Sequence, residues 1–197
     1  MAVILLAPFR IEEEIKKSRF IVNAAPIANG EEAKNFITAH QQPLANHNCW
    51  AWKAGQQYRF NDDGEPSGTA GKPILSAIEG NDCDQIVIIV TRFFGGVKLG
   101  ASGLIRAYGG SAARCLQQAP LHPLIHRQIY LFHCDYHQWP LLEKRLCTLE
   151  IIIDKLDFDA SGVNVCLQIP PAHVATLQQW LADLTKGRVI ATLLVDK

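Results

Sequence analysis

Residues Val90–Gly110 read VTRFFGGVKLGASGLIRAYGG and connect a strand to a helix through a glycine-rich loop. The run Ile86–Val90 that leads into them is apolar and rich in β-branched residues, which predicts a buried strand. From Ser102 onward, small and apolar residues recur at helical spacing and predict an amphipathic helix: Leu104, Ala107, Tyr108, Ser111 and Cys115. Backbone N–H groups at such a junction can bind an anion, so we expect this segment to contact a partner.

The charge of this region differs from that of the whole chain. The 197 residues carry 19 basic and 19 acidic side chains and have a formal net charge of zero. Residues 85–134 nevertheless contain no acid, and their bases are Arg92, Lys98, Arg106, Arg114 and Arg127. A local positive surface on a neutral protein favours a partner that bears phosphates. The alternative is that the glycines only permit close packing of helix and strand, while the arginines are solvated.

The first 85 residues show alternating strand and helix patterns. We predict a hairpin over Phe9–Pro26, a short helix that ends before Pro43, a strand over His47–Ala54, an irregular stretch from Phe60 to Thr69, and a helix from there to about Glu79. In the strand, alternation places His47, Cys49 and Ala51 on one face and Asn48, Trp50 and Trp52 on the other.

A second domain is predicted after Ala119–His126, where two prolines interrupt the helical pattern. The elements beyond it are a strand over Arg127–Cys134, a helix from Trp139 to Leu149, strands over Ile151–Phe158 and Val163–Ile169, a helix from Val174 to Leu184, and a strand over Val189–Val195. This βαββαβ order is that of the ferredoxin-like sandwich. The chain is therefore predicted to be α+β, with one domain over residues 1–124 and another over 126–197.

Cysteine usage and the N-terminal residues bear on the compartment. The six cysteines form no C-x-x-C pair, and MAVILLAPF lacks the basic start of a secretory signal. No run approaches the ~20 apolar residues of a membrane helix. We therefore expect a cytoplasmic protein with reduced thiols that does not associate with a membrane.

Two motifs could indicate catalysis. GTAGKP, Gly68–Pro73, contains the Gly-Lys pair of a phosphate-binding P-loop, but Pro66 stands in place of the first glycine and Pro73 in place of the hydroxyl residue, which excludes nucleotide hydrolysis by that route. A metal or hydrolytic site could instead use His47, Cys49, Asp62, Asp63 and Glu65. The alternative is that Cys49 is a small buried side chain and the acids cap loops and the following helix. Mixed ligand types with only one histidine favour this structural role, so we predict neither metal nor cofactor.

Three blocks of the sequence closely resemble the YigZ/IMPACT family: HNCWAW from His47, DDGEPSGTAGKPIL from Asp62, and the Val90–Gly110 segment. The resemblance covers essentially the whole chain. It implies an N-terminal domain similar to a ribosomal-protein fold and to domain IV of elongation factor G, followed by a ferredoxin-like domain similar to the last domain of that factor. Eukaryotic relatives regulate translation during amino-acid starvation through a further N-terminal domain. The family usually has glycine where Ser102 stands, and we expect Ser102 to cap the helix.

The residues and the resemblance together predict a non-enzymatic protein that binds RNA or the ribosome and regulates translation. The predicted nucleic-acid contacts are Arg92, Gly95, Gly96, Lys98, Gly100, Ser102, Gly103, Arg106 and Arg114. The family-motif loop comprises His47, Cys49, Asp62, Asp63, Gly64, Glu65, Gly68, Thr69, Gly71 and Lys72. Two alternatives stay open: a hydrolase built on His47, Cys49 and Asp62–Glu65, and a module that binds a protein partner without nucleic acid.

Overall fold

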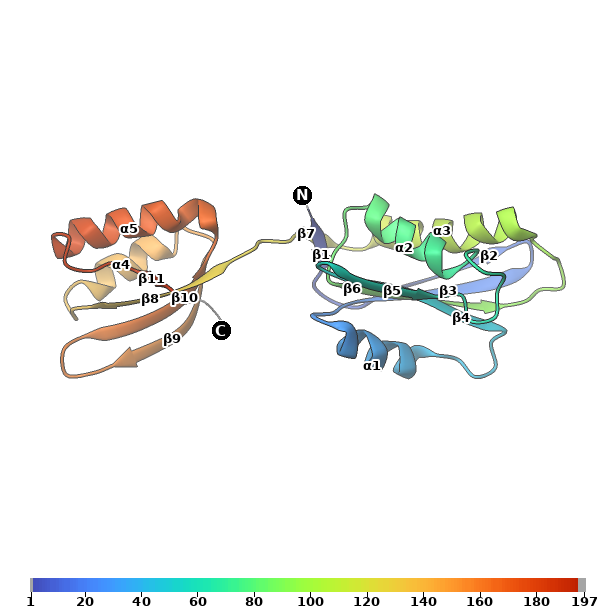
Figure 1. The fold of residues 1–197 in the computed structure, drawn as a ribbon, viewed down its shortest axis with the longest axis horizontal. Helices are drawn as coiled ribbons and strands as arrows, with labels where there is room; N and C mark the ends of the chain where they lie inside the picture. The colour runs from blue at the N-terminus through green and yellow to red at the C-terminus, as the bar shows by residue number, and fades with distance from the viewer. Residues whose placement is uncertain (1, 195–197) are drawn as a thin grey trace. The chain divides into compact units, whose positions relative to one another are not determined.

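The protein, a computed structural model that describes residues 2–194, has an α+β fold. It divides into two compact units, Met1–Leu124 and Ile125–Lys197, each with its own hydrophobic core. Figure 1 shows both units with their helices and strands labelled.

The N-terminal unit is built on a five-stranded antiparallel sheet with the strand order β2-β3-β6-β4-β5. Helices α2 and α3 cover one face of this sheet and α1 covers the other (Figure 1). The elements of the unit are β1 (Val3–Leu5), β2 (Phe9–Ile15), β3 (Ser18–Pro26), α1 (Gly30–His40), β4 (His47–Ala54), β5 (Gln57–Asn61), α2 (Gly71–Gly80), β6 (Ile86–Phe93), α3 (Ala101–Gln118) and β7 (Leu121–Pro123).

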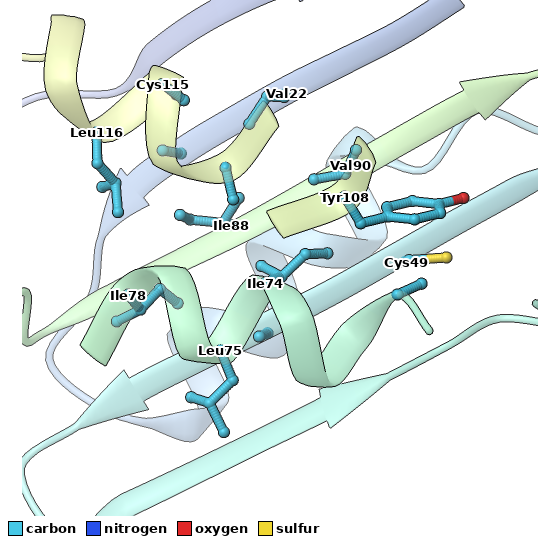
Figure 2. Close-up of a cluster of buried hydrophobic side chains, with 14 of the residues drawn as sticks. Val22, Cys49, Ile74, Leu75, Ile78, Ile88, Val90, Tyr108, Cys115 and Leu116 are labelled. Atoms are coloured by element: carbon cyan, nitrogen blue, oxygen red, sulfur yellow. The ribbon is translucent and has the colours of Figure 1, made fainter. Parts of the chain in front are cut away.

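Strand β6 lies at the centre of this sheet, which explains its continuous apolar sequence. Ile88 and Val90 face α2 and α3, whereas Val87 and Ile89 face α1, so that both surfaces of the strand are buried. Figure 2 shows the larger of the two clusters, in which Tyr108 of α3 joins Ile88 and Val90. The predicted strand over Ile86–Val90 is confirmed, and it continues to Phe93.

Helices α2 and α3 are in contact near Gly109 of the glycine-rich segment. A Cβ atom on Gly109 would lie 3.4 Å from both the Cβ and the carbonyl oxygen of Pro73, which is an ordinary van der Waals distance. Glycine in a helix interior costs about 1 kcal/mol relative to alanine. Close packing of the two helices therefore does not by itself require glycine at this position.

The C-terminal unit has the predicted ferredoxin-like order. Its four-stranded antiparallel sheet has the order β11-β8-β10-β9, and α4 and α5 pack on one face. Alternate residues of the central strand β10 are buried beneath these helices: Val163, Val165, Leu167 and Ile169. The elements are β8 (Gln128–Cys134), α4 (Trp139–Leu146), β9 (Ile152–Phe158), β10 (Val163–Ile169), α5 (Pro171–Thr185) and β11 (Thr192–Leu193).

Several predicted boundaries differ from those observed. The last strand, predicted over Val189–Val195, is only Thr192–Leu193 in the described residues, and Val195 lies outside them. The predicted irregular stretch begins inside β5, because Gln57–Asn61 pairs with β4 as an exposed edge strand. The proline-rich junction contains β7, whose short pairing with β1 ties it to the N-terminal unit.

The predicted cap of α3 is also wrong. Its N-cap is Gly100, whose φ of 72° lies in the left-handed region, and no side chain caps the helix. Ser102 is already inside the first turn, so it does not serve as the predicted cap.

Candidate nucleic-acid interface

The loop after β6 is held against the turn between β2 and β3. A Cβ atom on Gly95 would collide with the carbonyl group of Lys17, and the Gly95 amide donates a hydrogen bond to Ser18 Oγ at 3.3 Å. Lys16 and Lys17 form a two-residue turn with φ values of 47° and 64°, as in the tight hairpins that match the twist of the sheet. This contact brings Lys16 and Lys17, which are not among the predicted contacts, to the glycine-rich loop.

Five exposed cations around the start of α3 form what we call the basic surface: Lys16, Lys17, Lys72, Lys98 and Arg106. Within residues 2–194, none of them lies within 4.0 Å of a carboxylate oxygen. Arg106 is central, because it lines one groove with Lys72 and another hollow with Lys16. Unpaired cations from three segments therefore share one surface.

The N-terminus of α3 adds to the positive potential of this surface. No acidic residue occupies its first turn, and Gly100 offers no side chain to the amides of Ala101, Ser102 and Gly103. The first amides of a helix have no partner within the helix, and its dipole favours an anion there. The predicted donors between Gly100 and Gly103 are thus placed beside Lys98.

Arg92 requires a correction, because its side chain is not available to a phosphate. Only 6% of that side chain is exposed, and its Nη1 donates to Glu65 Oε1 at 2.6 Å. The Tyr108 hydroxyl donates a hydrogen bond to the same oxygen at 2.8 Å. The Glu65 side chain is itself 4% exposed. A buried pair of this kind holds the motif loop to β6 and α3.

Two further predicted contacts are satisfied within the protein. Arg114 forms a bidentate ion pair with Glu13, with nitrogen–oxygen distances of 2.8 and 2.7 Å. The amide of Gly95 already donates to Ser18, as described above. We therefore exclude both groups, together with Arg92, from the basic surface.

In the family-motif loop, Asp62 has a structural role. Its carboxylate accepts hydrogen bonds from the amides of Gly68, Ala70 and Gly71 at 2.8 to 2.9 Å. These bonds fix the loop and satisfy amides at the start of α2. Gly64 and Gly68 have φ values of 83° and 74°, which favour glycine.

Cys49 and His47 do not form a nucleophile and base. Cys49 is fully buried, its thiol donates to the Asp62 carbonyl at 3.0 Å, and burial raises the pKa of the thiol to about 12. His47 Nδ1 lies 2.8 Å from the Asp63 carbonyl and so donates to it, while Nε2 lies 3.8 Å from Glu65 Oε1. The hydrolase alternative loses its nucleophile. Within residues 2–194, no three His, Cys, Asp or Glu side chains are arranged to bind a metal.

The family-motif loop and the basic glycine-rich segment, which the sequence presents as alternative sites, meet at one place. His47 and Glu65 of the family-motif loop line a hollow of about 340 Å³ together with Arg92, Phe94 and Lys98 of the glycine-rich segment. The hollow opens beside the start of α3. The two segments therefore shape the same surface: Glu65 through its buried pair with Arg92, and Lys98 through its exposed charge.

Alkylation of the cysteines tests whether Cys49 is buried and unreactive in the folded protein. At pH 8, a pKa of about 12 leaves roughly one Cys49 thiol in 10⁴ ionised, and the thiolate is the reactive form. We expect iodoacetamide to alkylate the exposed Cys147 in the native protein and to leave Cys49 unmodified until denaturant is added. Peptide mass spectrometry measures both sites. Rapid alkylation of Cys49 in the native protein would support the alternative hypothesis that Cys49 is the nucleophile of a hydrolase.

Comparison with known proteins assigns the family. Residues 16–116 match the Impact N-terminal domain, and residues 132–188 match the DUF1949 domain of unknown function. An IMPACT family member from Thermus thermophilus is 42% identical over 176 residues, which cover 89% of this chain and 97% of that protein. The IMPACT family member YigZ of Escherichia coli is 39% identical over 188 residues and 92% of each chain. A crystal structure titled as that of a hypothetical protein is 37% identical, covers 100% of this chain and 98% of its own, and has a TM-score of 0.69. This chain belongs to the IMPACT family.

Proposed function

We propose that this protein binds RNA through backbone phosphates at the basic surface. The observation that carries the proposal is the set of five exposed cations without a carboxylate partner in the described chain, gathered at the N-terminus of α3. Neutralisation of phosphates by lysine and arginine supplies most of the affinity of RNA and DNA binders that do not select a sequence. The partner is therefore expected to be single-stranded or structured RNA with little base preference.

We further propose that the RNA is ribosomal or associated with translation, and that the protein acts in the cytoplasm. Family resemblance to ribosome-associated folds supports this finer proposal. None of the helices in the described part of the chain is both long and apolar enough to cross a membrane. Copurification with ribosomes from lysate, with and without ribonuclease, tests it. A partner retained after complete ribonuclease digestion would favour the protein-interaction alternative.

Arg106 is the most informative single position, because it lies between Lys16 and Lys72 on the basic surface. Each phosphate neutralised in single-stranded RNA contributes about 0.7 to the slope of log K against log salt concentration. We expect Arg106→Ala to flatten the slope by about 0.7 and to weaken binding by roughly fivefold at 0.1 M salt. Fluorescence anisotropy with oligoribonucleotides of different sequence measures both effects, which should be equal for all sequences.

The matched control is Arg10→Ala. Arg10 is also exposed, but it lies on β2 beside Glu12, at 3.7 Å, on the sheet face away from α3. We expect the slope for this variant to equal that of the parent. Equal slopes for Arg106→Ala and the parent would instead contradict the proposed contact surface.

A further inference from the structure

The face of the N-terminal sheet opposite the basic surface contains a cavity between α1 and the edge strand. Helix α1 packs over β6 and β4, where Ala33 and Ile37 contact the buried cluster with Val87 and Ile89. One helix cannot cover a sheet of five strands, so β5 is left outside it at this face. The space beside the helix has a volume of about 510 Å³, within the ~300–1,000 Å³ range of small-molecule sites.

Two tryptophans form the floor of this cavity. Trp50 and Trp52 are two residues apart on β4, so both side chains project to the face that α1 covers. Trp52 is 6% exposed, and a Cβ atom on Gly30 at the start of α1 would lie 3.0 Å from its ring, which shows how closely helix and indole pack. Trp50 is only half-buried, and the face of its ring can stack with a planar ligand.

The polar side chains around the tryptophans are either positively charged or neutral. Arg59 is the cross-strand partner of Trp52, and Gln57 projects from β5 on the same side. Lys34 and Thr38, one turn apart on α1, line the opposite wall. No carboxylate belongs to the lining within residues 2–194, and neither cation there lies within 4.0 Å of one. The lining therefore selects for a negative charge.

We propose that this cavity binds a nucleoside monophosphate, either free or as the end of an RNA strand. The base would stack on the ring of Trp50, as bases stack on aromatic side chains in known single-strand binders. Lys34 and Arg59 would bind the phosphate from two walls, and the amide of Gln57 can both donate to and accept from a base edge. The cavity lies across the sheet from the basic surface, so the inference does not depend on RNA binding there.

Intrinsic fluorescence tests the proposal, because Trp50 and Trp52 are two of the four tryptophans in the chain. We expect AMP to change the emission saturably, and adenosine and inorganic phosphate each to bind at least about tenfold more weakly. Lys34→Ala and Arg59→Ala should each weaken AMP binding by about tenfold, as expected for loss of a charged hydrogen bond. Equilibrium dialysis with labelled AMP gives a readout that does not depend on the tryptophans.

Lys53→Ala is the matched control, because Lys53 follows Trp52 and projects to the other face of the sheet. Its AMP affinity should stay within about twofold of the parent. Absence of saturable AMP binding in dialysis overturns the proposal. So does phosphate or adenosine binding as tight as AMP, or unchanged AMP affinity in both cavity variants. Competition by a short oligoribonucleotide with a 5′-phosphate would identify a strand end as the source, whereas AMP binding without such competition would identify the free nucleotide.

Discussion

Replacing Glu65 with alanine is expected to lower the free energy of unfolding by about 3–5 kcal/mol, the usual cost of breaking a buried ion pair. The Arg92 guanidinium would lose the partner at 2.6 Å, and the Tyr108 hydroxyl would lose the acceptor at 2.8 Å. Both groups are buried, so an unmet hydrogen-bond demand there is costly. Arg92 Nε already lacks a hydrogen-bond partner within the described residues, so without Glu65 the guanidinium would keep only the long hydrogen bond from Nη2 to Ser18 Oγ, at 3.4 Å. Urea denaturation followed by circular dichroism measures the change.

Two variants define the origin of that loss. Glu65→Gln keeps an oxygen that can accept from Tyr108 but removes the charge that balances Arg92, so its unfolding free energy should fall between those of the parent and Glu65→Ala. Glu13→Ala breaks the pair with Arg114, whose side chain is 44% exposed, and should cost no more than about 1 kcal/mol. If Glu65→Ala were no more costly than Glu13→Ala, the buried pair would not hold the motif loop in place.

Removal of four charges from the basic surface is expected to have the largest effect on RNA binding. Replacement of Lys16, Lys17, Lys98 and Arg106 by glutamine removes four phosphate contacts at about 0.7 each in log K against log salt. The affinity for single-stranded RNA should fall by roughly 600-fold at 0.1 M salt, and the slope of log K against log salt concentration should flatten by about 2.8, with Lys72 left as the one cation of the surface. All four side chains are exposed, so the unfolding transition should stay close to that of the parent.

A charge-matched variant separates this surface from a general effect of net charge. Lys144, Arg145, Lys155 and Lys186 are four exposed cations of the C-terminal unit. Their replacement by glutamine changes the net charge equally and should leave most of the affinity intact. Equal losses in the two variants, measured at several salt concentrations, would show that RNA responds to overall charge and not to the proposed surface.

The pattern of the sequence was sufficient for most of the fold. Alternation along Val163–Ile169 and helical spacing in the two flanking helices predicted the ferredoxin-like order that the structure confirms. The continuous apolar run of β6 likewise predicted a buried strand. These predictions succeed because burial on one face or both faces leaves a direct periodic record in the sequence. Short pairings such as β1 with β7 leave no such pattern, since three residues are too few to show alternation.

Charge pairing could not be predicted in the same way. The absence of acids from residues 85–134 predicted that Arg92 and Arg114 would be free, but Glu65 and Glu13 reach them from elsewhere in the chain. Conversely, two cations that were not predicted to belong to the surface around α3, Lys16 and Lys17, are brought to it by the hairpin turn. Electrostatic partners depend on distance in space, and a local sequence window contains no information about a carboxylate 27 or 101 residues away.

Residue order alone was enough to predict the family, the α+β class and a basic glycine-rich segment before a helix. The folded chain was needed to show which cations of that segment are exposed and unpaired, that Cys49 is buried and protonated, and that α1 leaves a tryptophan-lined cavity beside β5. The physical reason is that periodicity and residue type follow from local geometry and burial, whereas solvent exposure, ion pairing and cavities arise from segments distant in sequence that pack together.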